Sequence, residues 1–177
     1  MARIISGRAR NIDLEVPKSG TRPITDRAKS ALFSMIFNLT PNAKILDLFA
    51  GSGSLGIEAL SRGAKHATFI DSKDKAIECI HANLRKSKLA GSATVIQDTA
   101  ENFCQLCEKQ FDIIFLDPPY LSADESQLQL ATNCLQKDGI IILKHSPKFE
   151  VKEMEELRRV ESRKYGQNVI SFYVWKS

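Results

Sequence analysis

The sequence predicts an α/β fold built on a mostly parallel, doubly wound sheet. From residue 44 onward, strand-like apolar runs alternate with helical stretches, which is typical of βα units around a parallel sheet. Two of the runs, residues 113–116 and 140–143, are continuously apolar, as strands covered on both faces must be. A glycine-rich segment follows the earliest of these strand-like runs, residues 45–49. It therefore lies where such a sheet binds its ligand, outside the carboxyl end of a strand.

Residues 1–40 precede this pattern and predict a small β-hairpin and a helix. Residues 3–6 and 12–16 are short apolar runs, and Gly7, Arg8 and Arg10 lie between them. This is the pattern of a hairpin with an arginine-rich tip. Thr25 is placed to cap a helix that Pro41 ends. The apolar positions of that helix are Ala28, Leu32, Met35, Ile36 and Leu39.

Residues 41–177 are expected to form the core of a single domain, to which residues 1–40 add an extension. The strands are expected at residues 45–49, 67–71, 93–97, 111–117, 139–144 and 169–175, and helices at 54–62, 73–88 and 124–135. Ser122 and Glu125 form a capping box at the start of the last helix.

The composition indicates a cytoplasmic protein, which we expect to be a monomer. Hydrophobic residues make up 43% of the chain, but no run approaches the roughly 18 apolar residues of a membrane helix. The basic N-terminus also lacks the apolar region of a secretory signal. We therefore expect no membrane contact.

The net charge of +4 is concentrated near the N-terminus. Residues 1–30 contain seven basic and three acidic side chains, whereas the other residues carry 18 of each sign. A basic segment beside a neutral body suggests a polyanionic partner. On charge alone, a solvated, solubilising surface is an equally good interpretation.

The four cysteines indicate neither a disulfide framework nor a metal site. Cys104 and Cys107 form a C-x-x-C pair, a spacing found in zinc and redox sites. With Ala100 and Phe103, however, they follow the i, i+3, i+4, i+7 rhythm of an apolar helix face. There is no second pair with ligand spacing to complete a tetrahedral zinc site. We therefore expect no metal.

Residues 47–56 form the first candidate binding motif, at a strand-to-helix turn. Gly51 and Gly53 allow a tight turn and let a ligand approach the bare backbone. With Gly56 they also satisfy G-x-G-x-x-G, so the loop alone fits a dinucleotide site. The loop predicts a nucleotide-like ligand but does not choose between cofactors.

Two aspartates end the next two predicted strands. Asp71 is placed to accept hydrogen bonds from both ribose hydroxyls of an adenosine group, which would serve NAD and S-adenosylmethionine equally. Asp98 could hold the adenine amino group, or cap the helix that begins near Thr99. These two roles are compatible.

Asp117-Pro118-Pro119-Tyr120, at the end of the fourth predicted strand, points to methylation of an amino nitrogen. The amine of a base is a poor nucleophile, because its lone pair is delocalised into the ring. The Asp117 carboxylate and the Pro118 carbonyl can accept its two N–H bonds and direct the lone pair toward a methyl donor. The prolines stiffen that carbonyl, and Tyr120 offers a face for base stacking.

Residues 47–53 and 117–120 together resemble the class I methyltransferases that modify amino nitrogens. The match extends to Arg3-Ile4-Ile5-Ser6-Gly7, to Arg22-Pro23-Ile24-Thr25-Asp26-Arg27 and to residues 49–64. On these segments the chain resembles the bacterial 16S ribosomal RNA guanine-N2-methyltransferases of the RsmD type. The first two segments separate that family from DNA adenine and protein glutamine methyltransferases.

The resemblance implies a Rossmann-like methyltransferase sheet with an antiparallel last strand, and S-adenosyl-L-methionine as the cofactor. It also implies the substrate: N2 of one guanine, at position 966, in the 16S RNA of the small ribosomal subunit or its assembly intermediate. Carried over by position, the cofactor would be bound by Asp47, Phe49, Ala50, Gly51, Gly53, Asp71 and Asp98. The target base would meet Asp117, Pro118 and Tyr120, and the RNA would meet Arg3, Arg8, Arg10, Arg22 and Arg27.

The chain departs from the family pattern at two places. Asp71 stands where the family often has glutamate, a change that should keep the ribose contacts. Lys144 and His145 stand near the end of the fifth strand, where the family often has an acidic residue. The sequence leaves the role of this second segment open.

Three alternatives remain. The first is an amino-methyltransferase that acts on another RNA, on DNA adenine or on a protein amide, although the basic extension argues against a protein substrate. The second is an NAD-dependent oxidoreductase built on the same glycine loop, for which the sequence offers no evident hydride-transfer acid or base. The third is a non-catalytic RNA-binding assembly factor, which has no need for an amine-orienting carboxylate.

Overall fold

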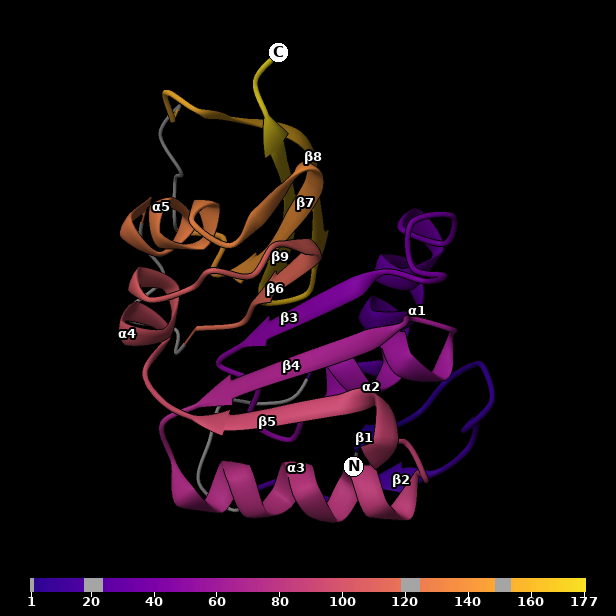
Figure 1. The fold of residues 1–177 in the computed structure, drawn as a ribbon. Helices are drawn as coiled ribbons and strands as arrows, with labels where there is room; N and C mark the ends of the chain where they lie inside the picture. The colour runs from indigo at the N-terminus through magenta and orange to yellow at the C-terminus, as the bar shows by residue number, and fades with distance from the viewer. Residues whose placement is uncertain (1, 18–23, 119–124, 149–153) are drawn as a thin grey trace.

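A computed structural model describes residues 2–17, 24–118, 125–148 and 154–177 (Figure 1). The N-terminal elements are β1 (Ala2–Arg3), β2 (Asp13–Leu14) and α1 (Asp26–Met35). They are followed by β3 (Lys44–Leu48), α2 (Ser54–Ser61), β4 (His66–Asp71), α3 (Asp74–Lys86), a 3-10 turn (Ala90–Ser92), β5 (Ala93–Gln97), α4 (Ala100–Gln105), β6 (Phe111–Leu116), α5 (Glu125–Thr132), β7 (Leu135–His145), β8 (Leu157–Tyr165) and β9 (Asn168–Trp175). No helix in these ranges is long and apolar enough to span a bilayer.

The central sheet has the strand order β5-β4-β3-β6-β7-β9-β8. The pairs from β5 to β7 are parallel, and β9 is antiparallel to both of its neighbours. The predicted doubly wound sheet with an antiparallel last strand is therefore confirmed. The edge strand β8 was not predicted, because its outward-facing positions are almost all polar. Charged side chains are common on exposed edge strands, since they discourage pairing with another chain.

Helices cover both faces of the sheet, with α1, α2 and α3 on one side and α4 and α5 on the other (Figure 1). Neighbouring residues of one strand enter different cores: Ile45 packs with the first group of helices and Leu46 with the second. The same alternation holds for Ile113 and Ile114 of β6. Burial on both faces explains why these strands are continuously apolar.

The N-terminal hairpin is present, and its tip is packed against α2. Its strands are shorter than predicted, but the Ile4 amide donates to the Ile12 carbonyl at 2.9 Å and extends the pairing beyond β1 and β2. At the tip, the Arg8 amide donates to the Ser61 carbonyl at 2.8 Å. A Cβ at Gly7 would lie 1.9 Å from that carbonyl oxygen. A glycine is therefore required for the tip to approach α2 this closely.

Helix α1 begins as predicted but ends early. The Thr25 hydroxyl accepts a hydrogen bond from the Ala28 amide at 3.3 Å, which confirms the predicted cap. The helix ends at Met35 rather than near Pro41, so the predicted end was wrong. Both the amide and the hydroxyl of Thr40 donate to the Ile36 carbonyl and close a turn there. Leu39, predicted on the apolar face, is half exposed.

Cys104 of the C-x-x-C pair lies on α4, as the helical rhythm predicted, whereas Cys107 lies beyond the end of the helix at Gln105. Cys104 is buried between α4 and the sheet, and Cys107 packs partly against the same core. Cys134 is buried nearby, and all four cysteines are free. These thiols behave as small apolar core residues.

Candidate active site

The loop between β3 and α2 has a backbone that few sequences can adopt. Phe49, Gly51 and Gly53 all have positive φ angles, of 61°, 56° and 73°. Glycine adopts this region freely, whereas for an aromatic residue it is an outlier. Strain of this kind persists where the surrounding structure imposes it, often at binding sites.

Two carboxylates hold this loop by accepting hydrogen bonds from its amides. Asp71 Oδ2, at the end of β4, accepts from the Gly51 amide at 2.9 Å. Asp47 Oδ2, within β3, accepts from the Gly56 amide at 2.9 Å. Gly56 has no room for a side chain, because a Cβ there would lie 2.3 Å from Phe69 Cε1. Two of the predicted binding residues therefore also set the shape of the loop.

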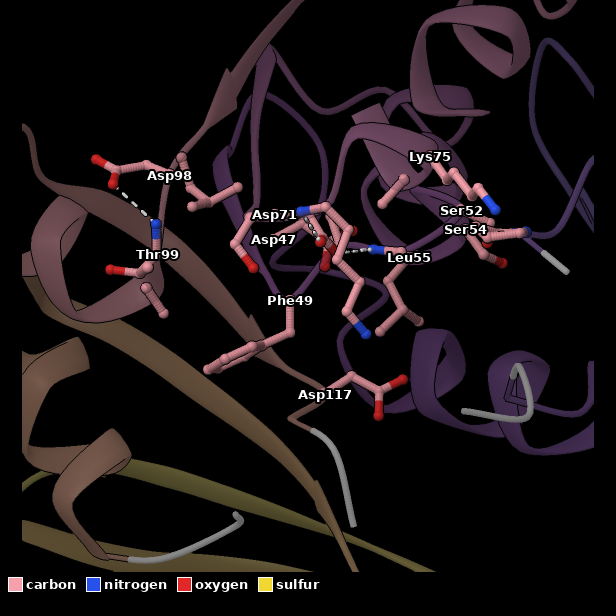
Figure 2. A pocket seen from close by; sticks show the side chains of 18 of the residues that line it. Asp47, Phe49, Ser52, Ser54, Leu55, Asp71, Lys75, Asp98, Thr99 and Asp117 are labelled. Atoms are coloured by element: carbon pink, nitrogen blue, oxygen red, sulfur yellow. Dashed lines mark hydrogen bonds between the residues drawn. The ribbon is translucent and has the colours of Figure 1, made fainter. Parts of the chain in front are cut away.

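A cavity of about 540 Å³ lies at the carboxyl ends of the strands (Figure 2). This volume is typical of small-molecule and cofactor sites. In Figure 2, Phe49 lies between Asp71 and Asp98 on one side and Asp117 on the other. The predicted cofactor residues that line the cavity are Asp47, Phe49, Ala50, Gly51, Asp71 and Asp98. Gly53 is not in the lining, and its left-handed backbone instead begins helix α2.

The N-terminal extension forms part of the cavity wall. Val16, Pro17 and Ile24, which follow the hairpin and precede α1, line it. Asn83 of α3 connects this wall to the glycine loop. Its side-chain amide donates to the Ser52 carbonyl at 2.9 Å, and its oxygen accepts from the Glu15 amide at 2.8 Å.

Asp47 is a buried acid that faces the cavity. Its exposed fraction is 2%, and burial raises the pKa of this carboxyl well above its usual range. The Gly56 amide opposes the shift, whereas the nearby carboxylates of Asp117 and Asp71 add to it. No ion pair to Asp47 is present among the described residues. A cationic group bound in the cavity would stabilise its ionised form.

Asp98 directly follows β5, and its carboxylate is already engaged. Asp98 Oδ1 accepts from the Thr99 amide at 2.8 Å, and the Asn102 side-chain amide donates to both carboxylate oxygens. The cap of α4 is Thr99, whose hydroxyl accepts from the Asn102 amide at 3.1 Å. Of the two roles that the sequence left open, Asp98 supports the start of the helix without being its cap. Oδ1 accepts two of these hydrogen bonds, whereas Oδ2 accepts one and keeps a second lone pair for a ligand.

Asp117 directly follows β6 and forms an ion pair with Lys144 of β7. Lys144 Nζ lies 2.7 Å from Oδ2 and 2.5 Å from Oδ1 of Asp117. The Asp117 side chain keeps 19% of its surface exposed, whereas Lys144 keeps 6%. Burial raises the pKa of the Asp117 carboxyl above its usual value, and Lys144 opposes this rise. The segment whose role the sequence left open therefore places a buried cation beside the predicted catalytic acid.

His145, the neighbour of Lys144, is not part of the cavity lining. Its Nε2 lies 2.8 Å from the Ser171 hydroxyl, and its Nδ1 lies 2.9 Å from the Ser146 carbonyl oxygen. The pKa of its imidazole is lowered, mainly by burial. His145 is thus a buried, hydrogen-bonded residue of the sheet.

The predicted RNA-binding and catalytic residues are only partly within the described ranges. Tyr120 and Arg22 lie outside them. Pro118 is buried beside Asp117. The other predicted RNA-binding residues, Arg3, Arg8, Arg10 and Arg27, are exposed, and Arg3 Nε lies 2.9 Å from Asp26 Oδ2.

Sequence reasoning did not find Asn83 or a role for Lys144. Asn83 lies in the middle of a predicted helix, where a buried polar residue is uncommon, and it contacts residues distant in sequence. For Lys144, a cation at the end of a continuously apolar strand was a usable signal, since lysine is almost never fully buried without a partner. Which partner it had could not be read from the chain.

These features define the class of protein. The sheet order, the glycine loop after the first core strand and the carboxylates at the ends of the next three strands are those of the Rossmann-like methyltransferases. In the part of the chain that the structure describes, no group of three or more histidine, cysteine or acidic side chains is arranged to hold a metal.

Comparison with known proteins identifies the family. The family model described as "Conserved hypothetical protein 95" matches residues 2–174. The chain is 39% identical to ribosomal RNA small subunit methyltransferase D of Escherichia coli strain K12 over 138 residues, covering 77% of this chain and 68% of that protein. It is 37% identical to Bacillus subtilis YlbH, provisionally named as an rRNA methyltransferase, over 97% of both chains. The solved structure of E. coli yhhF, provisionally titled a methyltransferase, has a TM-score of 0.88 and 31% identity over 98% of this chain and 97% of that one.

The chain belongs to the RsmD family of methyltransferases.

Proposed function

We propose that this protein transfers a methyl group from S-adenosyl-L-methionine to N2 of a guanine in the 16S RNA of the small ribosomal subunit. The observation that carries the proposal is that Asp117, the residue before Pro118, lines the same cavity as the glycine loop and Asp71. The names of the relatives support the RNA of the small ribosomal subunit as the substrate. The resemblance of the motifs supports the guanine at position 966 as the methylated base.

The cavity fits the proposed cofactor. The bare backbone at Gly51 and Ala50 would accommodate its methionine part, and the Asp47 carboxylate would pair with its ammonium group. Asp71 would accept from the ribose hydroxyls, and Asp98 from the adenine amino group. When bound, the cofactor supplies an electrophilic methyl group on a sulfonium.

Asp117 and Pro118 would orient the target amine. The carboxylate would accept one N–H and the Pro118 carbonyl the other, which directs the nitrogen lone pair toward the methyl group. The amine loses a proton after transfer, and the Asp117 carboxylate, which would already accept one of its N–H groups, would take it. Tyr120, outside the described residues, is proposed as the surface on which the base stacks. This arrangement requires Asp117 to be ionised.

The RNA would cross the edge of the sheet at which the strands end. Arg27 lies near the start of α1 at this edge. The exposed hairpin tip with Arg8 and Arg10 packs on Ser61, at the end of α2 away from the cavity, so these two arginines would contact RNA beyond this edge. The structure adds Arg163 and Lys164 of β8, which are exposed. The strand registers place Arg163 opposite Ile170, and Ile170 opposite Lys144. At about 4.8 Å between strands, Arg163 lies on the order of 10 Å from the Lys144 backbone.

A transfer assay tests the proposal. The purified protein and methyl-labelled S-adenosylmethionine are incubated with small subunits from cells that lack this methylation, with naked 16S RNA and with DNA. Nucleoside digests should contain labelled N2-methylguanosine. The variant Asp117→Ala should give none while it still binds the cofactor, because Asp117 serves the target amine.

The matched control is Asp112→Ala. Asp112 also belongs to β6, but at its opposite end, where it accepts from the Lys44 amide at 2.7 Å. This variant should methylate normally. Label in N6-methyladenine would overturn the assignment to guanine, and cofactor binding without transfer to any substrate would favour a non-catalytic role. Binding of NADH in preference to S-adenosylmethionine would point to an oxidoreductase.

A further inference from the structure

Lys144 is one of the few lysines that the fold removes from water. It lies one residue before the end of β7 and directly beside the strand that carries Asp117. Only 6% of its side chain is exposed, and Nζ contacts both oxygens of Asp117. A buried ammonium is unfavourable unless it is paired. The ion pair therefore fixes the orientation of the Asp117 carboxylate as well as that of the Lys144 side chain.

The environment of Asp117 otherwise favours the neutral acid. Burial raises the pKa of the Asp117 carboxyl, and Asp117 in turn raises the pKa of the neighbouring Asp47 carboxyl of β3. Gln127 of α5 lines the same cavity but carries no charge. Among the described residues that surround Asp117, Lys144 is the cation that opposes these effects.

The pairing leaves room for a substrate. A carboxylate offers about four lone-pair positions, and Lys144 approaches the two oxygens together from the β7 side. Asp117 is also the more exposed partner, at 19%, and it lines the cavity, whereas Lys144 does not. The lysine thus supports the carboxylate from the β7 side. Because Oδ1 is buried, the lone pair that Oδ2 keeps beside Lys144 is the one available to an amine.

We propose that Lys144 is a positioning residue, which holds Asp117 as an oriented carboxylate for the target amine. The inference rests on the proposed function, because it gives Asp117 a substrate. The alternative is that the ion pair has only a structural role and neutralises a buried acid. In that case loss of the Lys144 charge would lower the stability of the protein, and the protonation state of Asp117 would not affect the rate of methyl transfer.

Lys144→Met, which keeps the length of the side chain and removes its charge, separates these cases. The Asp117 carboxyl is followed by ¹³C NMR of aspartate-labelled protein, with Asp117→Asn to assign its signal. In Lys144→Met its titration should move to higher pH. At a pH below the raised pKa, a pKa that is higher by one reduces the ionised fraction of Asp117 about tenfold. At a pH below the raised pKa the rate of methyl transfer should fall accordingly and recover as the pH rises, while the KM for S-adenosylmethionine stays within about twofold.

Two further variants complete the test. Lys144→Arg restores the charge and should return the acid limb of the pH–rate profile to lower pH. Lys44→Met is the matched control, because it removes an exposed lysine at the amino end of β3, away from the cavity. It should leave the acid limb of the pH–rate profile unchanged. Circular dichroism and thermal unfolding verify folding, and Lys144→Gln replaces Lys144→Met should the latter not fold.

The outcomes distinguish this inference from the proposed function. An Asp117 titration that is the same in wild type and Lys144→Met would overturn the role of Lys144, whatever the activity. A pH–rate profile that does not move despite a shifted titration would reduce Lys144 to a structural ion pair. Failure of the wild type to methylate any guanine would instead overturn the proposed function, without bearing on the NMR result.

Discussion

Replacement of Glu58 by glutamine should destabilise the protein strongly, because Glu58 neutralises a buried lysine. Glu58 is fully buried in α2 and lies 3.5 Å from Lys29 Nζ. Its carboxylate also accepts from the amides of Ile5 and Ser6, at 2.8 and 3.1 Å, and from Arg62 Nε at 2.7 Å. One side chain therefore joins the hairpin, α1 and α2.

The expected loss follows from what the substitution leaves behind. Lys29 is 1% exposed and donates to the Arg3 carbonyl at 2.6 Å and to the Ser54 hydroxyl at 2.9 Å, which are both neutral acceptors. Removal of one partner of a buried ion pair costs about 3–5 kcal/mol. For a chain of this size, each kcal/mol lowers the Tm by about 2–4 °C, so Glu58→Gln should lower it by about 6–20 °C.

Urea denaturation followed by circular dichroism measures this loss directly. Glu161→Gln is the control, since Glu161 pairs with Arg163 at 3.6 Å with both side chains exposed. It should cost at most about 1 kcal/mol. The double variant Lys29→Met with Glu58→Gln should lose less than the sum of the single losses. A loss for Glu58→Gln no larger than that for Glu161→Gln would refute the reasoning.

Three further predictions concern the cavity and the proposed RNA surface. Asp71→Ala should weaken S-adenosylmethionine binding about tenfold to hundredfold in calorimetry, because it removes a charged acceptor and the support of the Gly51 amide; unchanged affinity would exclude Asp71 from the site. Since burial raises the pKa of Asp47, a cationic ligand should release a proton on binding and bind more tightly as pH rises through that raised pKa. Calorimetry in buffers of different ionisation enthalpy would detect the proton, and Asp47→Asn should abolish its release. Arg163→Gln with Lys164→Gln should weaken binding to 16S RNA and flatten its dependence on salt, and an unchanged salt slope would show that β8 does not contact RNA.

Much of the fold was predictable because its signals are local. Continuous apolar runs such as 113–116 and the glycine turn after β3 depend on short stretches of sequence, and they placed the strands to within a few residues. The strand β8 was missed because an exposed edge is free to carry polar residues on both faces. The end of α1 was misplaced because hydrogen bonds of Thr40 close the chain into a turn before Pro41 is reached.

The sequence by itself determined the class of fold and the chemical groups of the site: a glycine loop, aspartates after successive strands and an Asp-Pro-Pro-Tyr segment. Each is a pattern within one strand–loop unit. The tertiary structure alone decided which of these groups are paired. Lys144 meets Asp117 because β6 and β7 are parallel neighbours with Leu116 opposite Leu143, and Asn83 meets Ser52 because α3 packs beside the loop. Such contacts join residues separated by 27 and 31 positions, and they depend on strand order and register, which no local pattern contains.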